Sequence, residues 1–195
     1  MNAALRKLLK KGKSSAIPGN IEPMLATLVD EIPVDEQNWI YEIKWDGYRA
    51  IAYLNKGVVD IRSRNNKSFN EKFYPVYDAL KKWDAHAVVD GEVIVVNDEG
   101  MPDFSDLQLW RSEADGQVAF YLFDILWLDG YDITGLKLTD RKELLRQVIP
   151  QNDVVKYSED FEDGEMLFEQ IKAMELEGIV AKRKDSKYQP GKRVK

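Results

Sequence analysis

Glu42-Ile43-Lys44-Trp45-Asp46-Gly47-Tyr48-Arg49 is the most informative stretch of this chain. Aromatic and β-branched residues favour a strand on each side of it, and the Asp46-Gly47 pair favours a turn between the two strands. A lysine at a strand end is held in place and can face a cleft, and Gly47 lets the backbone turn tightly or approach a ligand closely. The planar guanidinium of Arg49 suits oxygen ligands. By itself, the pattern also fits a hairpin with a solvated lysine.

Further strands and helices are expected on both sides of this stretch. Alternating or short continuous apolar runs indicate strands, and apolar residues three and four positions apart indicate helices. Thr139 is a candidate N-cap and Pro150 a stop for one helix. The order predicts an α+β fold with mostly antiparallel sheets flanked by helices, in a domain at 21–195 after a basic helix or linker at 1–20. The expected strands are 39–44, 48–54, 58–62, 88–96 (interrupted at 90–92), 118–128 and 178–182, and the expected helices are 73–83, 104–110, 139–148 and 161–174.

The composition excludes several kinds of site. The chain has 195 residues, of which 44% are hydrophobic, and this is enough for a folded core. It has no cysteine, which excludes disulfides and thiolate metal sites and fits a reducing cytoplasm. The only histidine, His86, is expected at the surface or capping the helix 73–83, so a site built from several histidines is excluded. No apolar run approaches the length of a membrane span, and no secretory signal is recognised.

Charge is distributed unevenly along the chain. The net charge is −6, yet residues 1–13 hold five basic residues and no acidic one, and residues 182–195 hold seven basic residues and one acidic one. Basic ends can neutralise the phosphates of a nucleic acid. From charge alone, solvated tails are the better explanation.

The pattern Lys-x-Asp-Gly-x-Arg at 44–49 resembles the nucleophile motif of the covalent nucleotidyltransferases, which comprise DNA ligases, RNA ligases and mRNA capping enzymes. Further motifs of that superfamily follow in the correct order, and five short matches in order are far more specific than any one of them. These matches are Ser63-Arg64-Asn65, Asp90-Gly91-Glu92-Val93, the aromatic-rich strand 120–126 and Glu177-Gly178-Ile179-Val180-Ala181-Lys182. Pro23-Met24-Leu25-Ala26, the string from Glu42 to Ala50, and Tyr188-Gln189-Pro190-Gly191-Lys192-Arg193 resemble the ligase domain of bacterial ligase D, a family that serves non-homologous end joining.

The resemblance implies a nucleotidyltransferase fold similar to ATP-grasp proteins and a three-step reaction. A lysine attacks the α-phosphate of ATP, the AMP passes to a DNA 5′-phosphate, and the 3′-hydroxyl of the nick then expels AMP. Lys44 is the implied nucleophile. Because a free lysine is protonated at neutral pH, a nearby cation or metal ion must lower its pKa, and Lys182 is the candidate among the side chains.

The resemblance also implies which residues bind the nucleotide. Phe123 is expected to stack on adenine, with Val180 on the opposite face of the base. Glu42 and the backbone around Ile43 are expected at the adenine edge. The residues expected to contact phosphate and ribose oxygens are Arg49, Arg64, Glu92 and Lys182.

A metal ion, Mg²⁺ or Mn²⁺, is expected with the triphosphate, held by few carboxylates and mostly by water and phosphate oxygens. Glu177 is the first candidate ligand and Glu92 the second. Ordinary structural explanations exist for the same residues: Phe123 could be a core residue, Glu92 part of a turn, and Glu177-Gly178 the end of a helix.

Nicked or broken double-stranded DNA is the implied substrate, in a bacterial cytoplasm and associated with the nucleoid, with Ku and polymerase or nuclease domains as implied partners. The family also has a later Trp-x-Lys-x-Lys motif and a C-terminal OB-fold domain, and neither occurs before Lys195. The expectation is therefore a fragment that binds ATP and forms lysyl-AMP slowly on its own.

Two other functions remain open. An RNA ligase or a capping-type nucleotidyltransferase would use the same lysine on another substrate, and labelling by GTP would distinguish the capping enzyme. A non-catalytic nucleic-acid-binding module would bind through the basic ends, with Lys44 incidental. An NAD-dependent ligase is disfavoured, because the chain before Lys44 is short for the additional nicotinamide-binding domain of that class.

Overall fold

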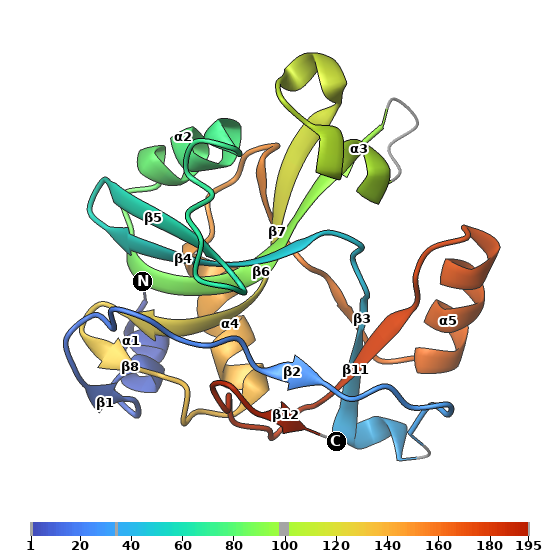
Figure 1. Cartoon of the computed structure of the whole chain (residues 1–195). Helices are drawn as coiled ribbons and strands as arrows, with labels where there is room; N and C mark the ends of the chain where they lie inside the picture. The colour runs from blue at the N-terminus through green and yellow to red at the C-terminus, as the bar shows by residue number, and fades with distance from the viewer. Residues whose placement is uncertain (1, 34, 98–101, 195) are drawn as a thin grey trace.

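The larger part of the molecule is a seven-stranded sheet (Figure 1), seen in a computed structural model that describes residues 2–33, 35–97 and 102–194. Its strands lie in the order β1-β8-β7-β6-β4-β5, with β9 also beside β7. Neighbours are antiparallel except β7 and β9, which are parallel. The bounds are β1 Lys13–Ser14, β4 Tyr48–Asn55, β5 Val58–Ser63, β6 His86–Val96, β7 Gln117–Leu128, β8 Tyr131–Asp132 and β9 Val155–Tyr157.

The main hydrophobic core lies on one face of this sheet. Side chains alternate between faces along a strand, so Ala50, Ala52 and Leu54 of β4 all point into this core. Leu5 and Leu9 bury one side of the first helix against the same core, which leaves its basic residues exposed. The helices that contribute to this core are α1 (Ala3–Leu9), α2 (Tyr74–Lys82), α3 (Phe104–Leu109) and α4 (Leu138–Val148).

The opposite face of the large sheet is partly covered by the chain before β3. Ile51 and Tyr53 of β4 alternate onto this face and pack with Trp127 in a smaller apolar cluster. The hydroxyl of Tyr53 accepts a hydrogen bond from the amide of Ile21 at 2.7 Å, which holds the covering segment in place. The same alternation places Arg49 on this face.

A second sheet of three antiparallel strands stands beside the large one (Figure 1), in the order β10 (Asp160–Phe161), β3 (Trp39–Ile43) and β11 (Ile179–Arg183). Tyr41 of β3 packs against Leu167 and Ile171 of α5 (Gly164–Ala173), so this face is apolar. Glu42 and its neighbour across the ladder, Val180, point to the other face. The remaining elements are the parallel pair β2 (Leu25–Ala26) and β12 (Arg193–Val194), and the 3₁₀ helices η1 (Glu36–Asn38) and η2 (Glu113–Asp115).

Two glycines of the quoted motifs are required by close packing of the backbone. A Cβ atom on Gly47 would collide with the carbonyl oxygen of Val93, and one on Gly91 would collide with the carbonyl oxygen of Tyr121. The segment after Lys44 is therefore pressed against β6. The close approach at Gly47 is made to the protein's own backbone.

The expected α+β fold with mostly antiparallel sheets is confirmed, and four local predictions are wrong. Strand β6 continues through 90–92, because two register shifts opposite β7 absorb the irregular residues. Lys137, and not Thr139, occupies the N-cap of α4. Phe161 pairs with Tyr41 in β10, so α5 begins only after Asp163, whose side chain accepts from the amide of Met166. His86 starts β6 and lies edge-on to Trp127 instead of capping a helix.

No helix within the described ranges has the length and apolar character that crossing a bilayer requires.

Candidate active site

Except for Arg64, the predicted site residues gather where the face of the small sheet that carries Glu42 meets the face of the large sheet that carries Arg49. Phe123 of β7 connects the two sheets, since the guanidinium of Arg49 and the amine of Lys182 each lie 4.4 Å from the centre of its ring. Arg49 comes from β4 in the large sheet and Lys182 from β11 in the small one. Phe123 is only 9% exposed, so these two cations cover part of the little surface that the ring offers.

Lys44 follows directly after β3, and its backbone amide donates to the carbonyl of Gly178 at 2.9 Å. Its amine forms an ion pair with Glu177, the residue before that glycine. The two side chains are 45% and 40% exposed, so the amine is accessible from solvent. Gly178, between Glu177 and β11, has a φ of 147°, which a residue with a side chain rarely adopts.

Arg49 is fixed by Asp90 of β6. Its guanidinium donates to both carboxylate oxygens of Asp90, at 2.6 and 2.7 Å, and more weakly to the carbonyl of Met24 at 3.3 Å. The hydroxyl of Tyr188 donates to the same carboxylate at 2.6 Å. Burial lowers the pKa of Arg49, but the attraction of Asp90 outweighs burial and raises it overall. Arg49 is therefore a permanent cation in a preset orientation.

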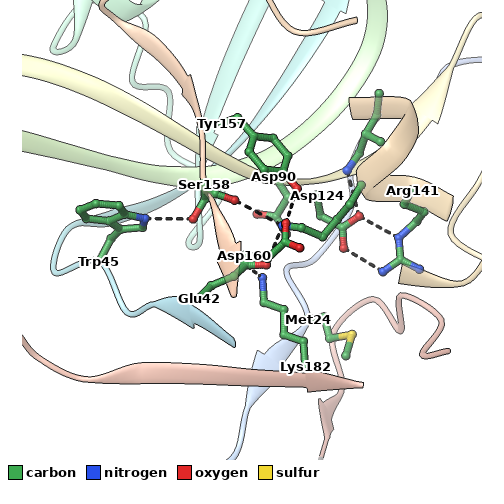
Figure 2. A network of polar contacts seen from close by, with 12 residues as sticks. Met24, Glu42, Trp45, Asp90, Asp124, Arg141, Tyr157, Ser158, Asp160 and Lys182 are labelled. Carbon is green, nitrogen blue, oxygen red and sulfur yellow. Dashed lines mark hydrogen bonds and ion pairs between the residues drawn. The ribbon is translucent and has the colours of Figure 1, made fainter. Parts of the chain in front are cut away.

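Glu42 is a buried carboxylate between two lysines. Lys142 of α4 donates to one oxygen at 2.7 Å. Lys182 donates to the other at 2.8 Å (Figure 2). Burial lowers the pKa of Lys182, and the attraction of Glu42 opposes this effect. Lys182 was expected beside the amine of Lys44, where its charge would lower the pKa of that amine. In the structure, Lys182 instead contacts Glu42 and Phe123, while Lys44 contacts Glu177.

Glu92 lies opposite Arg49 in the β4–β6 ladder and therefore on the same face. Burial raises its pKa to about 8, although attraction to Arg49 and Lys44 opposes the rise. In the free protein, Glu92 is thus mostly protonated at neutral pH. It is part of a strand, so the alternative explanation of a turn does not apply.

Arg64 lies apart from this group. It is exposed in the turn after β5 and lines a cavity of about 380 Å³, together with Arg62 and the segment around Glu22. A second cavity of about 250 Å³ lies between Ser15 and Trp127. Neither of these two cavities includes Lys44, so the cavity beside Arg64 does not bring it together with the proposed nucleophile.

Ile43 and Val180 take opposite sides of the small sheet. The side chain of Ile43 packs toward α5, so only its backbone is available to a ligand on the inner face. Val180 is half-buried and faces inward beside Glu42. Among the described residues, no group of three or more His, Cys, Asp or Glu side chains is arranged to hold a metal ion.

The arrangement of these side chains suits one kind of reaction best, which is attack by an amine on a phosphate. An accessible amine lies beside one carboxylate, Glu177, and near a second, Glu92, whose pKa reflects the charge of Lys44. A buried ring flanked by two cations lies in the same region and suits a planar group that bears anionic oxygens. The arrangement favours attack by the amine of Lys44 on a phosphate of a bound nucleotide.

Residues 23–195 match the family of ATP-dependent DNA ligase domains. The chain belongs to this family. It is 35% identical over 185 residues to the multifunctional non-homologous end joining protein LigD of Mycolicibacterium smegmatis, across 94% of this chain and 24% of that protein. It is 32% identical to the prophage-derived DNA ligase-like protein LigB of Bacillus subtilis, across 89% of this chain and 64% of that protein.

Solved structures agree with this membership of the ligase family. A mycobacterial DNA ligase D complexed with ATP and MES superimposes with a TM-score of 0.79 at 36% identity, across 89% of this chain and 57% of that one. The Chlorella virus DNA ligase-adenylate has a TM-score of 0.65 at 18% identity and shows the shared fold. The resemblance to the ligase domain of bacterial ligase D is confirmed. The chain spans about a quarter of the length of the curated LigD relatives.

Several residues of the ligase domain site were missed by the sequence analysis. Asp90 and Tyr188 occur in quoted motifs, so their positions were marked but their contact with Arg49 was not anticipated. Arg141 and Lys142 occupy the buried stripe of α4 with Leu138 and Leu145. Two charges at apolar spacing were a signal that these side chains have buried partners.

Proposed function

We propose that this chain is the adenylation domain of an ATP-dependent DNA ligase, with Lys44 as the nucleophile. The side chain of Lys44 releases a proton to solvent and its nitrogen forms a bond to the α-phosphorus of ATP. The bond between that phosphorus and the oxygen that bridges the α- and β-phosphates breaks, and pyrophosphate leaves. The observation that carries the proposal is the accessible Lys44 amine beside Glu177, next to the cluster formed by Phe123, Arg49 and Lys182.

The nucleotide would lie between the two sheets. Phe123 and Val180 supply the apolar surfaces for adenine, and Glu42 and the backbone of Ile43 supply hydrogen-bonding groups at its edge. The mycobacterial DNA ligase D of the same fold was solved as a complex with ATP, which supports a nucleotide site here. The side chains that would contact phosphate and ribose oxygens are Arg49, Glu92 and Lys182. Arg64, expected among them from the sequence, lies apart from this group and is not included in the proposal.

A divalent cation fits Glu177 better than Glu92. Glu177 is a partly exposed carboxylate beside the reacting amine, whereas Glu92 must first lose a proton that burial helps it keep. Few protein carboxylates suffice, because Mg²⁺ takes most of its ligands from water and phosphate. When bound, Mg²⁺ or Mn²⁺ would neutralise charge on the triphosphate.

Intact-mass measurement after incubation with ATP and Mg²⁺ tests the nucleophile. The wild-type chain should gain the mass of one AMP, and label from α-labelled but not γ-labelled ATP should stay with the protein. Lys44→Ala should abolish this gain. Lys184→Ala is the matched control, because Lys184 is also in an ion pair at the end of β11 but lies outside the site. Labelling that survives Lys44→Ala would remove the assignment, and labelling by GTP instead of ATP would indicate a capping-type enzyme.

DNA as the substrate is supported by the first helix. Leu5 and Leu9 fix α1 against the core, and its basic residues are all exposed, so the cations form a positioned surface and not a loose tail. A surface of this charge attracts the phosphates of duplex DNA and releases counterions.

Salt dependence of DNA binding tests this surface. Arg6→Gln with Lys7→Gln, the two exposed basic residues of α1, should reduce the slope of log Kd against log salt by about 0.9 for each phosphate that the variant no longer neutralises. Self-adenylation should not change, because that step does not involve DNA. Lys81→Gln with Lys82→Gln removes two exposed charges of α2 as a control. An equal reduction in both double variants would contradict a specific role for α1.

For the later steps and the partners, the proposal extends what the relatives are described as doing. In the full-length enzyme the AMP would pass to a DNA 5′-phosphate and the nick would be sealed. Two LigD relatives are described as multifunctional non-homologous end joining proteins, which supports a role in that repair process. Ku and polymerase or nuclease domains are the partners that this role would require. Sealing of nicked DNA but not nicked RNA by the full-length enzyme would separate this proposal from an RNA ligase.

A further inference from the structure

Lys142 is a lysine in the interior of the molecule, with only 1% of its side chain exposed. It lies on the buried stripe of α4 beside Leu145 and is far from the quoted motifs in sequence. A buried ammonium is costly unless several acceptors surround it, so its partners must be fixed in the folded protein.

The partners of Lys142 lie on both sides of the proposed nucleophile. Its amine donates to Glu42 at 2.7 Å, and Glu42 is two residues before Lys44. It also donates to the carbonyl of Ser158 at 3.4 Å, and the hydroxyl of Ser158 accepts from the indole of Trp45 at 3.1 Å (Figure 2). Trp45 comes directly after Lys44. Lys142 thus holds the segment 42–45 at both ends, once directly and once through Ser158.

The amine of Lys142 has two further contacts. Asp160 lies 3.4 Å away, and the ring of Tyr157 lies 4.7 Å from the amine. Asp160 is itself paired with Arg146 at the surface, so Lys142 is not its sole cation. Glu42, in contrast, has Lys142 on one oxygen and Lys182 on the other.

The two lysines on Glu42 differ in their freedom. Lys142 is enclosed, whereas 21% of the Lys182 side chain is exposed and its amine also lies over Phe123. If Lys182 turns toward a phosphate, Glu42 still has a cation within hydrogen-bond distance. Without Lys142, the same movement would leave a buried carboxylate with no cationic partner, which is strongly unfavourable.

We propose that Lys142 is a positioning residue that keeps Glu42 paired and the segment 42–45 in place, and so releases Lys182 to the nucleotide. This inference rests on the proposed function for the role of Lys182. The positioning of 42–45 does not need a nucleotide and can be measured in its absence.

The first measurement is amide hydrogen exchange without ATP. Lys142→Met should raise exchange in 42–45 while exchange in the core strand β6 stays unchanged. Arg146→Met is the matched control, since Arg146 is on the same helix and contacts Asp160 but not Glu42. Lys142→Arg should restore part of the protection. If Lys142→Met does not unfold cooperatively, Lys142→Gln replaces it. Unchanged exchange at 42–45 in the folded variant would overturn the inference.

The second measurement is the rate of AMP labelling as a function of ATP concentration. Lys142→Met should raise the half-saturating ATP concentration by about tenfold or more, because ATP must then break the only ion pair of Glu42. Arg146→Met should stay within about twofold of wild type. In a Glu42→Gln background, adding Lys142→Met should have little further effect on the half-saturating ATP concentration, because residue 42 then carries no charge that Lys142 must keep paired.

The outcomes separate the two proposals. If the two substitutions Lys142→Met and Glu42→Gln raise the half-saturating ATP concentration by factors that multiply in the double variant, Lys142 does not act through Glu42 and the inference is overturned. If the wild-type chain is not labelled at all, the proposed function fails, and the exchange measurement still decides whether Lys142 positions the segment. If Lys142 had only a structural role, Lys142→Met would lower the stability of the protein both in the wild type and in the Glu42→Gln variant. Its effect on the half-saturating ATP concentration would then not depend on Glu42.

Discussion

The ion pair at Lys44 and the ion pair at Arg141 are opposite in design. Lys44 and Glu177 are both about half-exposed and form their pair at the surface of the site. Arg141 and Asp124 are buried and joined by two hydrogen bonds of 2.7 and 2.9 Å, and Arg141 also donates to the carbonyls of Leu136 and Ser186. The proposed reacting groups can therefore change partners easily, whereas the charges that support the fold have a fixed and complete set of partners.

The largest effect on the free energy of unfolding is expected at the buried pair. Arg141→Met should destabilise the protein by about 3–5 kcal/mol, because Asp124 then remains buried without a cation. Urea denaturation followed by tryptophan fluorescence would measure the change. The double variant Asp124→Leu with Arg141→Met should recover much of the loss, because no buried charge is left. A single variant as stable as wild type would show that the pair is not a structural requirement.

Substitution of Glu92 is expected to have an intermediate effect on the free energy of unfolding, and this effect should depend on pH. Its pKa in the folded protein is about 8, above the usual value near 4.5. Between these values, a rise in pH removes the proton from the unfolded state first, so the unfolding free energy falls as pH rises and levels off above about 8. Glu92→Gln should remove this fall and be more stable than wild type by roughly 1–3 kcal/mol at pH 8, with little difference near pH 4.

Denaturation at both pH values without divalent cations is the appropriate comparison for Glu92. A difference between Glu92→Gln and wild type that is the same at pH 4 and pH 8 would show that Glu92 titrates normally. The exposed residue Glu165 of α5 provides a control substitution to glutamine.

The smallest effect on stability is expected at the exposed pair. Lys44→Ala and Glu177→Gln should each change the unfolding free energy by no more than about 0.5 kcal/mol, because solvent screens an exposed ion pair. Lys44→Ala should nevertheless remove all AMP labelling. A loss of stability at Lys44 that rivals the loss at Arg141 would remove the distinction between the two regions.

Elements with a clear apolar pattern could be predicted from the sequence. Strands β4, β5 and β7 and helices α2 and α3 lie within about two residues of the expected bounds, because apolar runs and helical spacing mark the residues that they bury. Short strands such as β9 and β10 were not expected. Two or three residues carry no detectable period, and their conformation is fixed by the neighbouring strand, as Phe161 is fixed by Tyr41.

The site could be predicted as a set of residues but not as a set of contacts. The motifs marked Lys44, Arg49 and Glu177, but the sequence does not show that Glu177 pairs with Lys44 or that Asp90 holds Arg49. Lys142 was missed because its burial depends on Glu42, which is 100 positions away in the chain. Contacts of this kind depend on which strands and helices the fold brings together.

Any side chain at Gly47 would collide with the backbone of Val93. This collision determines which residues of the motif can change during evolution. Glycine at this position is required by the backbone packing of the two strands, whether or not the lysine reacts. A descendant that had lost its chemistry would be free to replace Lys44 but would still need the glycine. The glycine would therefore mark ancestry, and under the proposed function only the lysine would mark an active enzyme.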